Sequence, residues 1–172
     1  MNLFEIRRAC EADLPVMMQI YTRARAFMTE QGNPRQWGAT GWPPEDVIRR
    51  DIAEDHSYVC TLEGRVCGTF FFVAGEAPDP CYLRIEDGAW LDPSPYGVVH
   101  RLASDGSVKG IGQACMDWTF AQCGHLRIDT HPDNIPMQNL LAKCGFRRCG
   151  IIHVAQDNDP RLAFEKTVGW EE

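Results

Sequence analysis

The chain has 172 residues, of which 44% are hydrophobic and 24% are charged, and its net charge is −7. This composition is ordinary for a globular protein, and we expect a single domain over residues 1–172 with a sizeable core. An acidic chain without a basic stripe is unsuited to nucleic acid or an anionic membrane, so we expect neither as a partner. Because no apolar run reaches the length of a transmembrane helix and the first residues lack the apolar centre of a signal peptide, we expect a cytoplasmic protein.

Eight cysteines are present, but no two of them form a Cys-x-x-Cys pair. They stand mostly beside apolar residues, as small buried side chains do, so we expect neither a disulfide framework nor a metal site. The negative charge is compatible with a small cationic substrate, although most acidic proteins are simply soluble.

The first half of the chain predicts one strand, two helices and a strand hairpin. Residues 4–8 alternate apolar and polar side chains, which is typical of a strand. Asp13 is the expected N-cap of a first helix, whose apolar stripe runs from Leu14 to Met28. The further elements expected here are a helix over 45–55 and strands over 57–62, 66–74 and 81–86.

Residues 31–44 (QGNPRQWGATGWPP) are rich in glycine and proline, which predicts a loop. The loop also holds Trp37 and Trp42, and this aromatic content is unusual for a simple linker. Two interpretations stay open, namely that these indole rings pack against the core or that they line a substrate pocket.

The second half of the chain alternates strands and helices. A strand over 98–103 leads into a glycine turn, and from Ile111 onward the apolar residues recur at the spacing of a helix face. This order predicts an α/β layered (α+β) domain with a mostly antiparallel central sheet and one parallel crossover. The further elements expected here are a helix over 134–144 and strands over 125–130, 146–154 and 161–168.

The turn before the helix reads Lys109-Gly110-Ile111-Gly112. A glycine-rich turn that opens a helix gathers unpaired backbone N–H groups at the positive end of the helix dipole, which favours phosphate binding. A short Gly-x-Gly is weak evidence on its own, because glycine also serves ordinary turns.

Two stretches of this half are similar to signatures of the GNAT superfamily of acyl-CoA-dependent N-acetyltransferases. Residues 107–112 (SVKGIG) resemble its phosphate-binding pattern Gln/Arg-x-x-Gly-x-Gly/Ala, with Ser107 where Gln or Arg is usual. Residues 133–146 resemble the helix that follows in that family, in the same order and spacing. The resemblance implies a mixed sheet of about six to seven strands flanked by about four helices, with the fourth and fifth strands parallel and splayed.

The resemblance implies acetyl-CoA as co-substrate. Its pyrophosphate would accept hydrogen bonds from the backbone between Val108 and Gln113, where the glycines allow close approach and Lys109 adds positive charge. Its pantetheine arm would pair with the strand backbone and meet Asn134, while Lys143 matches a helix lysine near the adenine end or in solvent. The implied binding residues are Leu102, Ala103, Ser104, Ser107, Val108, Lys109, Gly110, Ile111, Gly112, Gln113, Asn134 and Lys143.

Acyl transfer to an amine requires a neutral nitrogen, so a general base is expected. His100 is the leading candidate, because some relatives carry a base at its position, and the alternative is a histidine that only bonds to a neighbouring strand. Glu86 is the second candidate, either as a base or as a carboxylate that binds a cation. Asp129 is expected in the substrate pocket beside the two loop tryptophans, and His131 either borders that pocket or serves the turn before Pro132.

The general acid usual in this family is a tyrosine on the helix that here spans 134–144, and that position is Leu141. The proton for the leaving thiolate would then come from water or from another group. Cys144 lies one turn further along the helix, but a cysteine on an apolar helix face is more often part of the core. We therefore assign no general acid from the sequence.

We expect an N-acetyltransferase that moves an acetyl group from acetyl-CoA directly to a primary amine of a small molecule in a ternary complex. One alternative is a CoA-binding sensor or regulatory domain without turnover, which Leu141 motivates. Another is an enzyme that acts on a protein or peptide amine. The blandest alternative is an α/β domain whose Gly110-Ile111-Gly112 is accidental. Family members often form dimers, so a homodimer also stays open.

Overall fold

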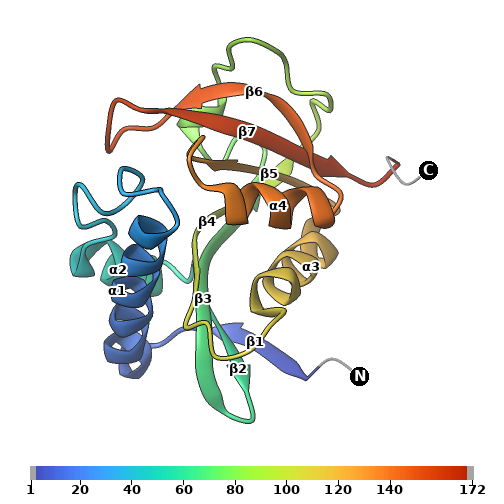
Figure 1. The fold of residues 1–172 in the computed structure, drawn as a ribbon. Coiled ribbons are helices and arrows are strands. Elements are labelled where there is room, and N and C mark those ends of the chain that lie inside the picture. The colour runs from blue at the N-terminus through green and yellow to red at the C-terminus, as the bar shows by residue number, and fades with distance from the viewer. Residues whose placement is uncertain (1–2, 170–172) are drawn as a thin grey trace.

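Seven strands form one mixed sheet in the spatial order β1-β2-β3-β4-β5-β7-β6 (Figure 1). The computed structural model describes residues 3–169. The strands are β1 (Phe4–Arg8), β2 (Ser57–Leu62), β3 (Arg65–Gly75), β4 (Tyr96–Ser104), β5 (His125–Thr130), β6 (Arg147–His153) and β7 (Pro160–Thr167). The helices are α1 (Leu14–Glu30), α2 (Glu45–Ala53), α3 (Ile111–Cys123) and α4 (Ile135–Lys143), with short 3₁₀ helices η1 (Glu11–Asp13) and η2 (Pro80–Tyr82).

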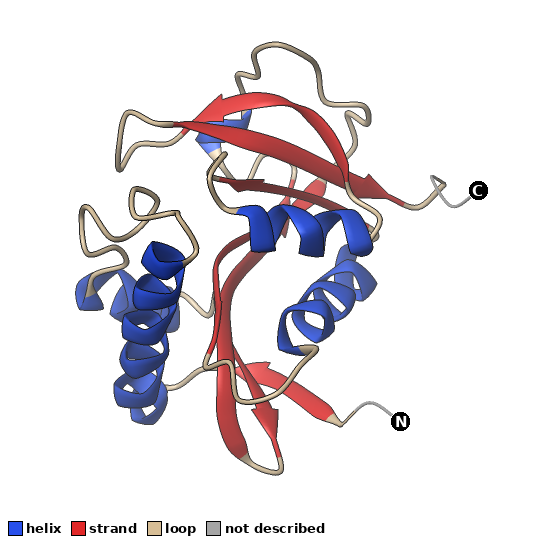
Figure 2. Ribbon diagram, viewed as in Figure 1, coloured by secondary structure: helices blue, strands red, loops and turns tan. Residues whose placement is uncertain are grey.

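Helices cover both faces of the sheet. α1 and α2 lie on one face, and α3 and α4 lie on the other (Figure 2). The core under α3 and α4 includes Leu126 and Leu141, and the core under α1 and α2 includes Tyr21 and Ile48. The predicted α/β layered architecture, with a mixed and mostly antiparallel sheet and four helices, is therefore confirmed.

β4 and β5 run parallel, while every other neighbouring pair in the described sheet is antiparallel. Their ladder contains only Gly97 opposite Leu126 and Val98 opposite Arg127, and beyond it the two strands separate. From Val99 onward, the edge of β4 that faces β5 has no ladder partner among residues 3–169. The splayed pair of parallel strands was predicted, and it opens the sheet at its centre.

β4 carries a bulge where it leaves β5. Thr69 pairs with Ala103 and Phe71 pairs with His100, so β4 has one residue more than β3 between these two pairs. Arg101 lies in this bulge with φ of 54°, in the left-handed region that non-glycine residues rarely adopt. A bulge of this kind bends the strand and redirects its side chains.

The bulge changes which face each side chain of β4 reaches. Val99 and Leu102 both pack in the core under α3 and α4, although strict alternation would place them on opposite faces. Arg101 reaches the other face, where it contacts Asp51 of α2. His100 is on this face too, where its ring packs against that of Tyr82. Two consecutive polar side chains therefore point toward the same side of the opened sheet.

The predicted strand over 81–86 was wrong. The segment begins with η2, and Glu86 makes only an isolated bridge with Ile151. The carboxylate of Asp79 accepts a 2.8 Å hydrogen bond from the N–H of Cys81, and the proline that follows Asp79 fixes φ for a helical turn. A side-chain cap and a proline thus outweigh the strand-like composition.

Asp13 stands at the predicted N-cap position of α1, but its side chain does not cap the helix. Asp13 makes no side-chain hydrogen bond to the start of α1. Its carboxylate accepts two hydrogen bonds from Arg7, at 2.8 and 2.9 Å, and one from the N–H of Cys10 at 2.8 Å. The hydrogen bonds from Arg7 lower the pKa of Asp13 to about 2, despite partial burial. Asp13 therefore joins β1 to η1 rather than capping the helix.

Candidate active site

Two cavities meet where β4 and β5 separate. The first, which we call the His100 cavity, has a volume of about 170 Å³ and is walled by β4, β5, the loop 31–44 and residues 154–161. The second, the Gly112 cavity, has a volume of about 290 Å³ and lies between the ends of α1 and β4 and the starts of α3 and α4. Both are lined by Met28, Leu102, Asn134 and Met137, so they adjoin one another.

His100 lies in the wall of the His100 cavity between two carboxylates. Its Nε2 is 2.5 Å from Oδ2 of Asp79, and its Nδ1 is 3.7 Å from Oδ1 of Asp129. Asp129 also accepts a 2.6 Å hydrogen bond from the hydroxyl of Tyr82. Three separate segments of the chain therefore hold one imidazole at the position where the sequence predicts a general base.

The partners of His100 indicate which ring nitrogen carries the proton. Burial raises the pKa of Asp79, but the hydrogen bond and charge of His100 and the N–H of Cys81 outweigh burial, so the net pKa is lowered. An ionised carboxylate only accepts hydrogen bonds, so Nε2–H of His100 donates to Asp79. The lone pair of Nδ1 is then available to accept a proton beside Asp129.

The hydroxyl of Tyr82 binds Asp129, the second carboxylate beside His100. Burial, followed by the nearby charge of Asp129, raises the pKa of Tyr82 well above its ordinary value. The phenol therefore stays protonated and donates to Asp129. Because the Tyr82 ring also contacts the ring of His100, it fixes the imidazole and Asp129 at the same time.

Trp37 and Trp42 both pack against the core and line a cavity, and the use of that cavity by a substrate stays a prediction. Both line the His100 cavity. Trp37 is buried in the core under α1, where its ring lies 5.8 Å from that of Tyr21 in an edge-on arrangement. Trp42 is partly buried against the same core. The loop that carries the two rings is thus a packed wall of the cavity.

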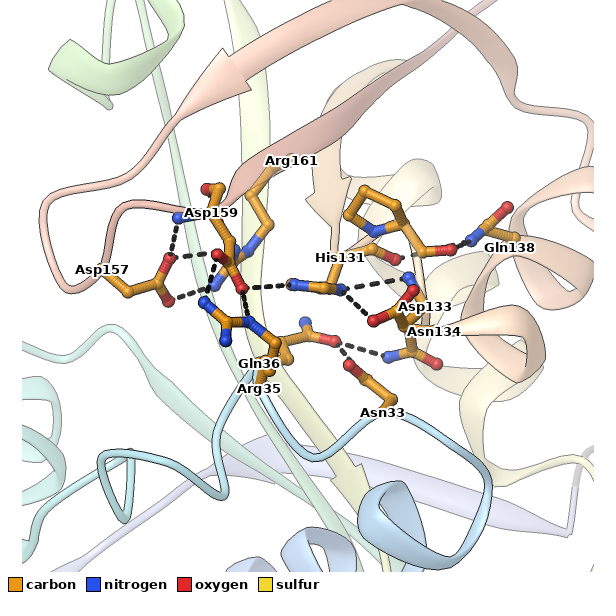
Figure 3. A network of polar contacts seen from close by, with 11 residues as sticks. Asn33, Arg35, Gln36, His131, Asp133, Asn134, Gln138, Asp157, Asp159 and Arg161 are labelled. Carbon is orange, nitrogen blue, oxygen red and sulfur yellow. Dashed lines mark hydrogen bonds and ion pairs between the residues drawn. The ribbon is translucent and has the colours of Figure 1, made fainter.

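Polar contacts hold the loop 31–44 against the chain segments across the cavity (Figure 3). Arg35 donates two hydrogen bonds to Asp159, at 2.7 and 2.8 Å, and Nε2 of His131 lies 2.9 Å from the same carboxylate. The N–H of Asp133 donates to Nδ1 of His131, so a neutral His131 donates through Nε2. The hydrogen bonds from Arg35 and His131 hold the pKa of Asp159 well below its usual range. His131 therefore serves the turn and does not line either cavity.

Gln36 joins the same loop to α4. Its Oε1 accepts hydrogen bonds from the side-chain amides of Asn33 and Asn134, each at 2.8 Å (Figure 3). Oδ1 of Asn134 in turn accepts a 3.1 Å hydrogen bond from the N–H of Met137, which caps α4. Asn134 lines both cavities, and its implied contact with a pantetheine arm stays a prediction.

The Gly112 cavity fits a long ligand with apolar and amide parts. Its lining is largely apolar and includes Phe27, Met137 and Leu140. Asn33 also lines it, and Oδ1 of this side chain is buried and has no hydrogen-bond partner among the described residues. A buried acceptor without a partner is costly, and an amide N–H of a ligand would satisfy it. The residues present are therefore compatible with the pantetheine arm of acetyl-CoA.

The two glycines of the turn are needed for different reasons. Gly110 has φ of 93°, which disfavours any side chain, and a Cβ there would meet only the ring of Phe4 at 3.8 Å. A Cβ on Gly112 would lie 2.9 Å from Cδ2 of Leu140, so this glycine lets α3 approach α4. Close approach of a phosphate, which the sequence predicts for both glycines, stays a prediction.

Ser107 is bound by an arginine from β3. Nη2 of Arg65 donates a 2.8 Å hydrogen bond to Oγ of Ser107, and Nη1 contacts Asp105 at 2.6 Å. A guanidinium therefore reaches the turn from a neighbouring strand, at the position where the family pattern carries Gln or Arg in the turn itself. Val108 and Lys109 beside it are exposed.

Glu86, the second predicted base, lies outside both cavities. It contacts Arg84 at 3.0 Å and His153 at 3.3 Å, and all three side chains are at least partly exposed. The bridge between Glu86 and Ile151 fixes this segment to β6, away from the opening between β4 and β5. We therefore do not retain Glu86 in the candidate site.

Three further predictions depended on side chains of α3 and α4. Ile111 is buried in the core, so it can contact a ligand only through its backbone. Lys143 is exposed and lines neither cavity. Leu141 and Cys144 are both buried in the core under the helices, which agrees with the absence of a predicted general acid there. Five of the predicted cofactor-binding residues line the Gly112 cavity, namely Leu102, Ala103, Ser104, Gly112 and Asn134.

Several functional candidates were missed in the sequence because nothing local marks them. Asp79 belongs to a Pro/Asp turn that reads as an ordinary loop, and Thr130 reads as the end of a buried strand. Only the fold brings such residues to the cavities. The missed lining residues with polar side chains are Arg23, Gln31, Asn33, Gln36, Asp79, Cys81, Arg101, Asp105, Thr130, Gln156 and Arg161.

All eight cysteines are free thiols. Within residues 3–169, no group of three or more His, Cys, Asp or Glu side chains is placed to hold a metal ion. Across the same residues, no helix combines the length and apolar character needed to cross a membrane.

Comparisons with known proteins find matches among solved structures, and these share the fold described above. No protein-family model and no curated protein sequence matches the chain. Among solved structures, a GNAT-family acetyltransferase from Streptococcus agalactiae 2603 is 29% identical, with a TM-score of 0.82 over 95% of each chain. One from Listeria monocytogenes 4b F2365 is 16% identical, with a TM-score of 0.66 over 95% of this chain and 94% of that one. The ribosomal-protein-S18-alanine N-acetyltransferase of Escherichia coli is 14% identical, with a TM-score of 0.61 over 95% and 92%.

Proposed function

The chain belongs to the GNAT superfamily of acetyltransferases, and we propose that it transfers an acetyl group from acetyl-CoA to the primary amine of a small molecule. The transfer is direct, within a ternary complex, and needs no covalent intermediate on the protein. The observation that carries the proposal is the junction of two cavities at the opening between β4 and β5, with His100 in its wall. The Gly112 cavity receives the acetyl donor, and the His100 cavity receives the amine.

His100 supplies the general base. An alkylamine with an ordinary pKa of about 10.4 is almost entirely protonated at neutral pH, so its nitrogen must lose a proton before it can attack. Nδ1 of His100 takes this proton, directly or through one water, while Asp79 holds Nε2–H and stabilises the imidazolium that forms. Asp129, 3.7 Å from Nδ1, adds a second negative charge beside it.

Acetyl-CoA, when bound, supplies an acetyl thioester whose sulfur is the leaving group. The carboxyl-terminal half of β4 has backbone N–H groups without a partner on β5, and these are available to donate to the acetyl carbonyl. Oδ1 of Asn33 accepts from an amide of the arm, and the N–H groups at the start of α3 bind phosphate.

The thiolate requires a proton, and α4 offers none because Leu141 is buried in the core. On the way from ammonium to amide the amine nitrogen loses two protons, forms a bond to the acetyl carbon and displaces the thiolate as the carbon–sulfur bond breaks. The first proton passes to His100 before attack, and we assign His100 to return it to the thiolate because it lines the cavity and can both take up and release a proton. The second proton leaves the nitrogen to solvent after the new bond has formed. In this assignment His100 also serves as the general acid, which is the function of the tyrosine that Leu141 replaces, so no second catalytic residue is needed.

The loop 31–44 favours a small acceptor. Arg35 and Gln36 tie it to Asp159 and Asn134, and Trp37 and Trp42 close the cavity behind these contacts. The Escherichia coli structural neighbour is named for a protein substrate, ribosomal protein S18. Because the tied loop of this chain forms a wall of the cavity that holds His100, we take the small amine as the better supported acceptor.

The binding half of the proposal is tested by the melting temperature of the protein with acetyl-CoA, CoA or ATP. Saturation at about 100 times the dissociation constant stabilises a protein by roughly 2.7 kcal/mol, which shifts the melting temperature by several degrees. Acetyl-CoA and CoA should both give this shift, and ATP should give a much smaller one. Absence of any shift with acetyl-CoA would contradict the proposed donor site.

Two variants of α1 make the test specific. Ala24 lines the Gly112 cavity, whereas Ala26 is exposed on the same helix and does not line it. Ala24→Trp should abolish the shift with acetyl-CoA because the indole fills the cavity, and Ala26→Trp should retain it. Equal shifts in the two variants would place the donor elsewhere.

A further inference from the structure

The charges around the His100 cavity are unevenly compensated. Two arginines line this cavity, and each is bound to its own aspartate. Arg101 contacts Asp51 with Nη2 at 2.7 Å and Nε at 3.0 Å. Arg161 contacts Asp157 with Nη2 at 2.7 Å and Nη1 at 3.2 Å. Neither aspartate lines the cavity, so the charge of each guanidinium group is neutralised by a carboxylate that lies outside the cavity.

The two carboxylates that line the cavity have no such compensation. Asp79 and Asp129 contact His100, Tyr82 and the N–H of Cys81, and neither forms an ion pair with a lysine or arginine among the described residues. Two carboxylates therefore face the cavity with only the imidazole of His100 between them, and no lysine or arginine side chain of the described residues pairs with either.

Other features of the wall also suit a cation with N–H groups. Thr130 lines the cavity and is fully buried, and its hydroxyl has no hydrogen-bond partner among residues 3–169. A buried oxygen of this kind can accept from a ligand N–H. Trp37 and Trp42 line the same space, and indole faces attract ammonium groups.

From this charge balance we infer that the natural acceptor is an aliphatic amine that carries positive charge and no carboxylate, such as a diamine, rather than an amino acid. The inference rests on the proposed function and specifies its acceptor. An ammonium group would be attracted by Asp79 and Asp129 as it approaches His100. A carboxylate on the same molecule would be repelled by these aspartates and would find both arginines already paired.

Pairs of amines that differ only in a carboxylate measure the effect of that carboxylate on acceptor preference. Cadaverine is L-lysine without its carboxylate, and putrescine is L-ornithine without its carboxylate. We expect kcat/KM to be at least about tenfold higher for each diamine than for its amino acid, which corresponds to about 1.4 kcal/mol of charge interaction. L-lysine methyl ester, which has lost the carboxylate charge, should recover most of this difference. Equal or higher kcat/KM for the amino acids would overturn the inference.

Two variants connect the preference to the cavity. Asp129→Asn removes one cavity charge, so the ratio of kcat/KM between cadaverine and L-lysine should fall several-fold. Glu86→Gln removes an equal charge outside both cavities and should leave the ratio unchanged. An equal change in the two variants would mean that net charge alone sets the preference, which would also overturn the inference.

Calorimetric binding of cadaverine and L-lysine to the protein with CoA separates this inference from the proposed function. Tighter binding of cadaverine supports the inference whether or not turnover is seen. If cadaverine binds more tightly but no amine is acetylated, only the proposed function fails. If amines are acetylated but L-lysine binds as tightly as cadaverine, only the inference fails. If neither compound binds, the inference is overturned.

Discussion

The imidazole of His100 and the carboxylate of Asp79 are in hydrogen-bond contact at 2.5 Å, although 21 positions separate them in the chain. His100 lies on β4 directly before the bulge at Arg101, and Asp79 caps η2 through the N–H of Cys81. The cap fixes the position of the carboxylate that contacts the imidazole. In the proposed mechanism, this pair is a base of defined orientation in a protein that lacks the tyrosine usual in the family.

The first prediction concerns Asp79. The pKa of this carboxyl lies below its usual value, so it remains ionised at the pH of an ordinary assay. Asp79→Asn should lower kcat/KM by about 10- to 100-fold, because His100 loses its orientation while part of the base contribution survives. The acidic limb of the pH profile should also move to lower pH, because the imidazolium loses a neighbouring negative charge.

Steady-state kinetics between pH 5.5 and 9 check this prediction. Glu76→Gln is a suitable control, because Glu76 is exposed and lines neither cavity. A variant with reduced kcat/KM and an unshifted acidic limb would mean that Asp79 is only structural.

The second prediction concerns the loop 31–44. Arg35→Met removes the two hydrogen bonds to Asp159 while it retains an aliphatic side chain. The wall formed by Gln36 and Trp37 should loosen, so KM for the amine should rise several-fold while kcat changes little. Arg49→Met, which alters an exposed arginine of α2, provides the matched control. A fall in kcat alone would contradict the proposed role of the loop.

The third prediction concerns the contact between α3 and α4. Gly112→Ala should destabilise the fold by about 1 kcal/mol, because the new methyl group meets Leu140 at 2.9 Å and the leucine must shift. In a Leu140→Ala background the same change should cost less, and urea denaturation of the four proteins measures this coupling. Equal costs in both backgrounds would show that Gly112 is needed for another reason.

The fourth prediction is a pH dependence of stability. The pKa of Asp13 is about 2 in the folded protein, below the ordinary 3.8 of an aspartate, so the folded state favours the ionised form. The ionised Asp13 carboxylate therefore adds to the free energy of unfolding above pH 4, and this stabilisation is lost as the pH falls toward 2. Asp13→Asn should lower the free energy of unfolding by about 1–2 kcal/mol at pH 7, since the half-exposed Arg7 is partly screened.

Urea denaturation of wild type and Asp13→Asn at several pH values measures this difference. The difference in the free energy of unfolding between the two proteins should narrow below pH 4. Asp55→Asn, the control, alters an exposed ion pair of 3.8 Å and should change the free energy of unfolding little. A gap that is constant with pH would mean that Asp13 acts through packing rather than charge.

Much of the fold could be predicted because periodicity and glycine placement are local properties. The helix from Ile111, the strand before it and the helix over 134–144 each follow from their own residues. The pairing of β4 with β5 followed from the family resemblance, and the structure confirms it. The strand expected over 81–86 was wrong because Asp79 caps a 3₁₀ turn, an effect of one side chain that composition does not show.

The site was less predictable because it depends on contacts between distant segments. His100 could be chosen because it stands on the strand before the glycine turn, but its partner Asp79 lies in a loop with no pattern of its own. Glu86 was the second candidate base in the sequence, and the structure, in which it bridges to Ile151, places it outside the two cavities. Thr130 and Asn33 have side chains that matter because they lack partners, which no sequence pattern can reveal.

The most direct test of the account is amine-dependent release of CoA thiol from acetyl-CoA by wild type and by His100→Gln. Wild type should release thiol in proportion to added diamine, and the variant should lose about 100- to 10,000-fold in rate while its melting temperature still rises with acetyl-CoA. A wild type that binds acetyl-CoA without amine-dependent release would contradict the proposed enzyme. A variant that turns over as fast as wild type would contradict the assignment of His100 as the base.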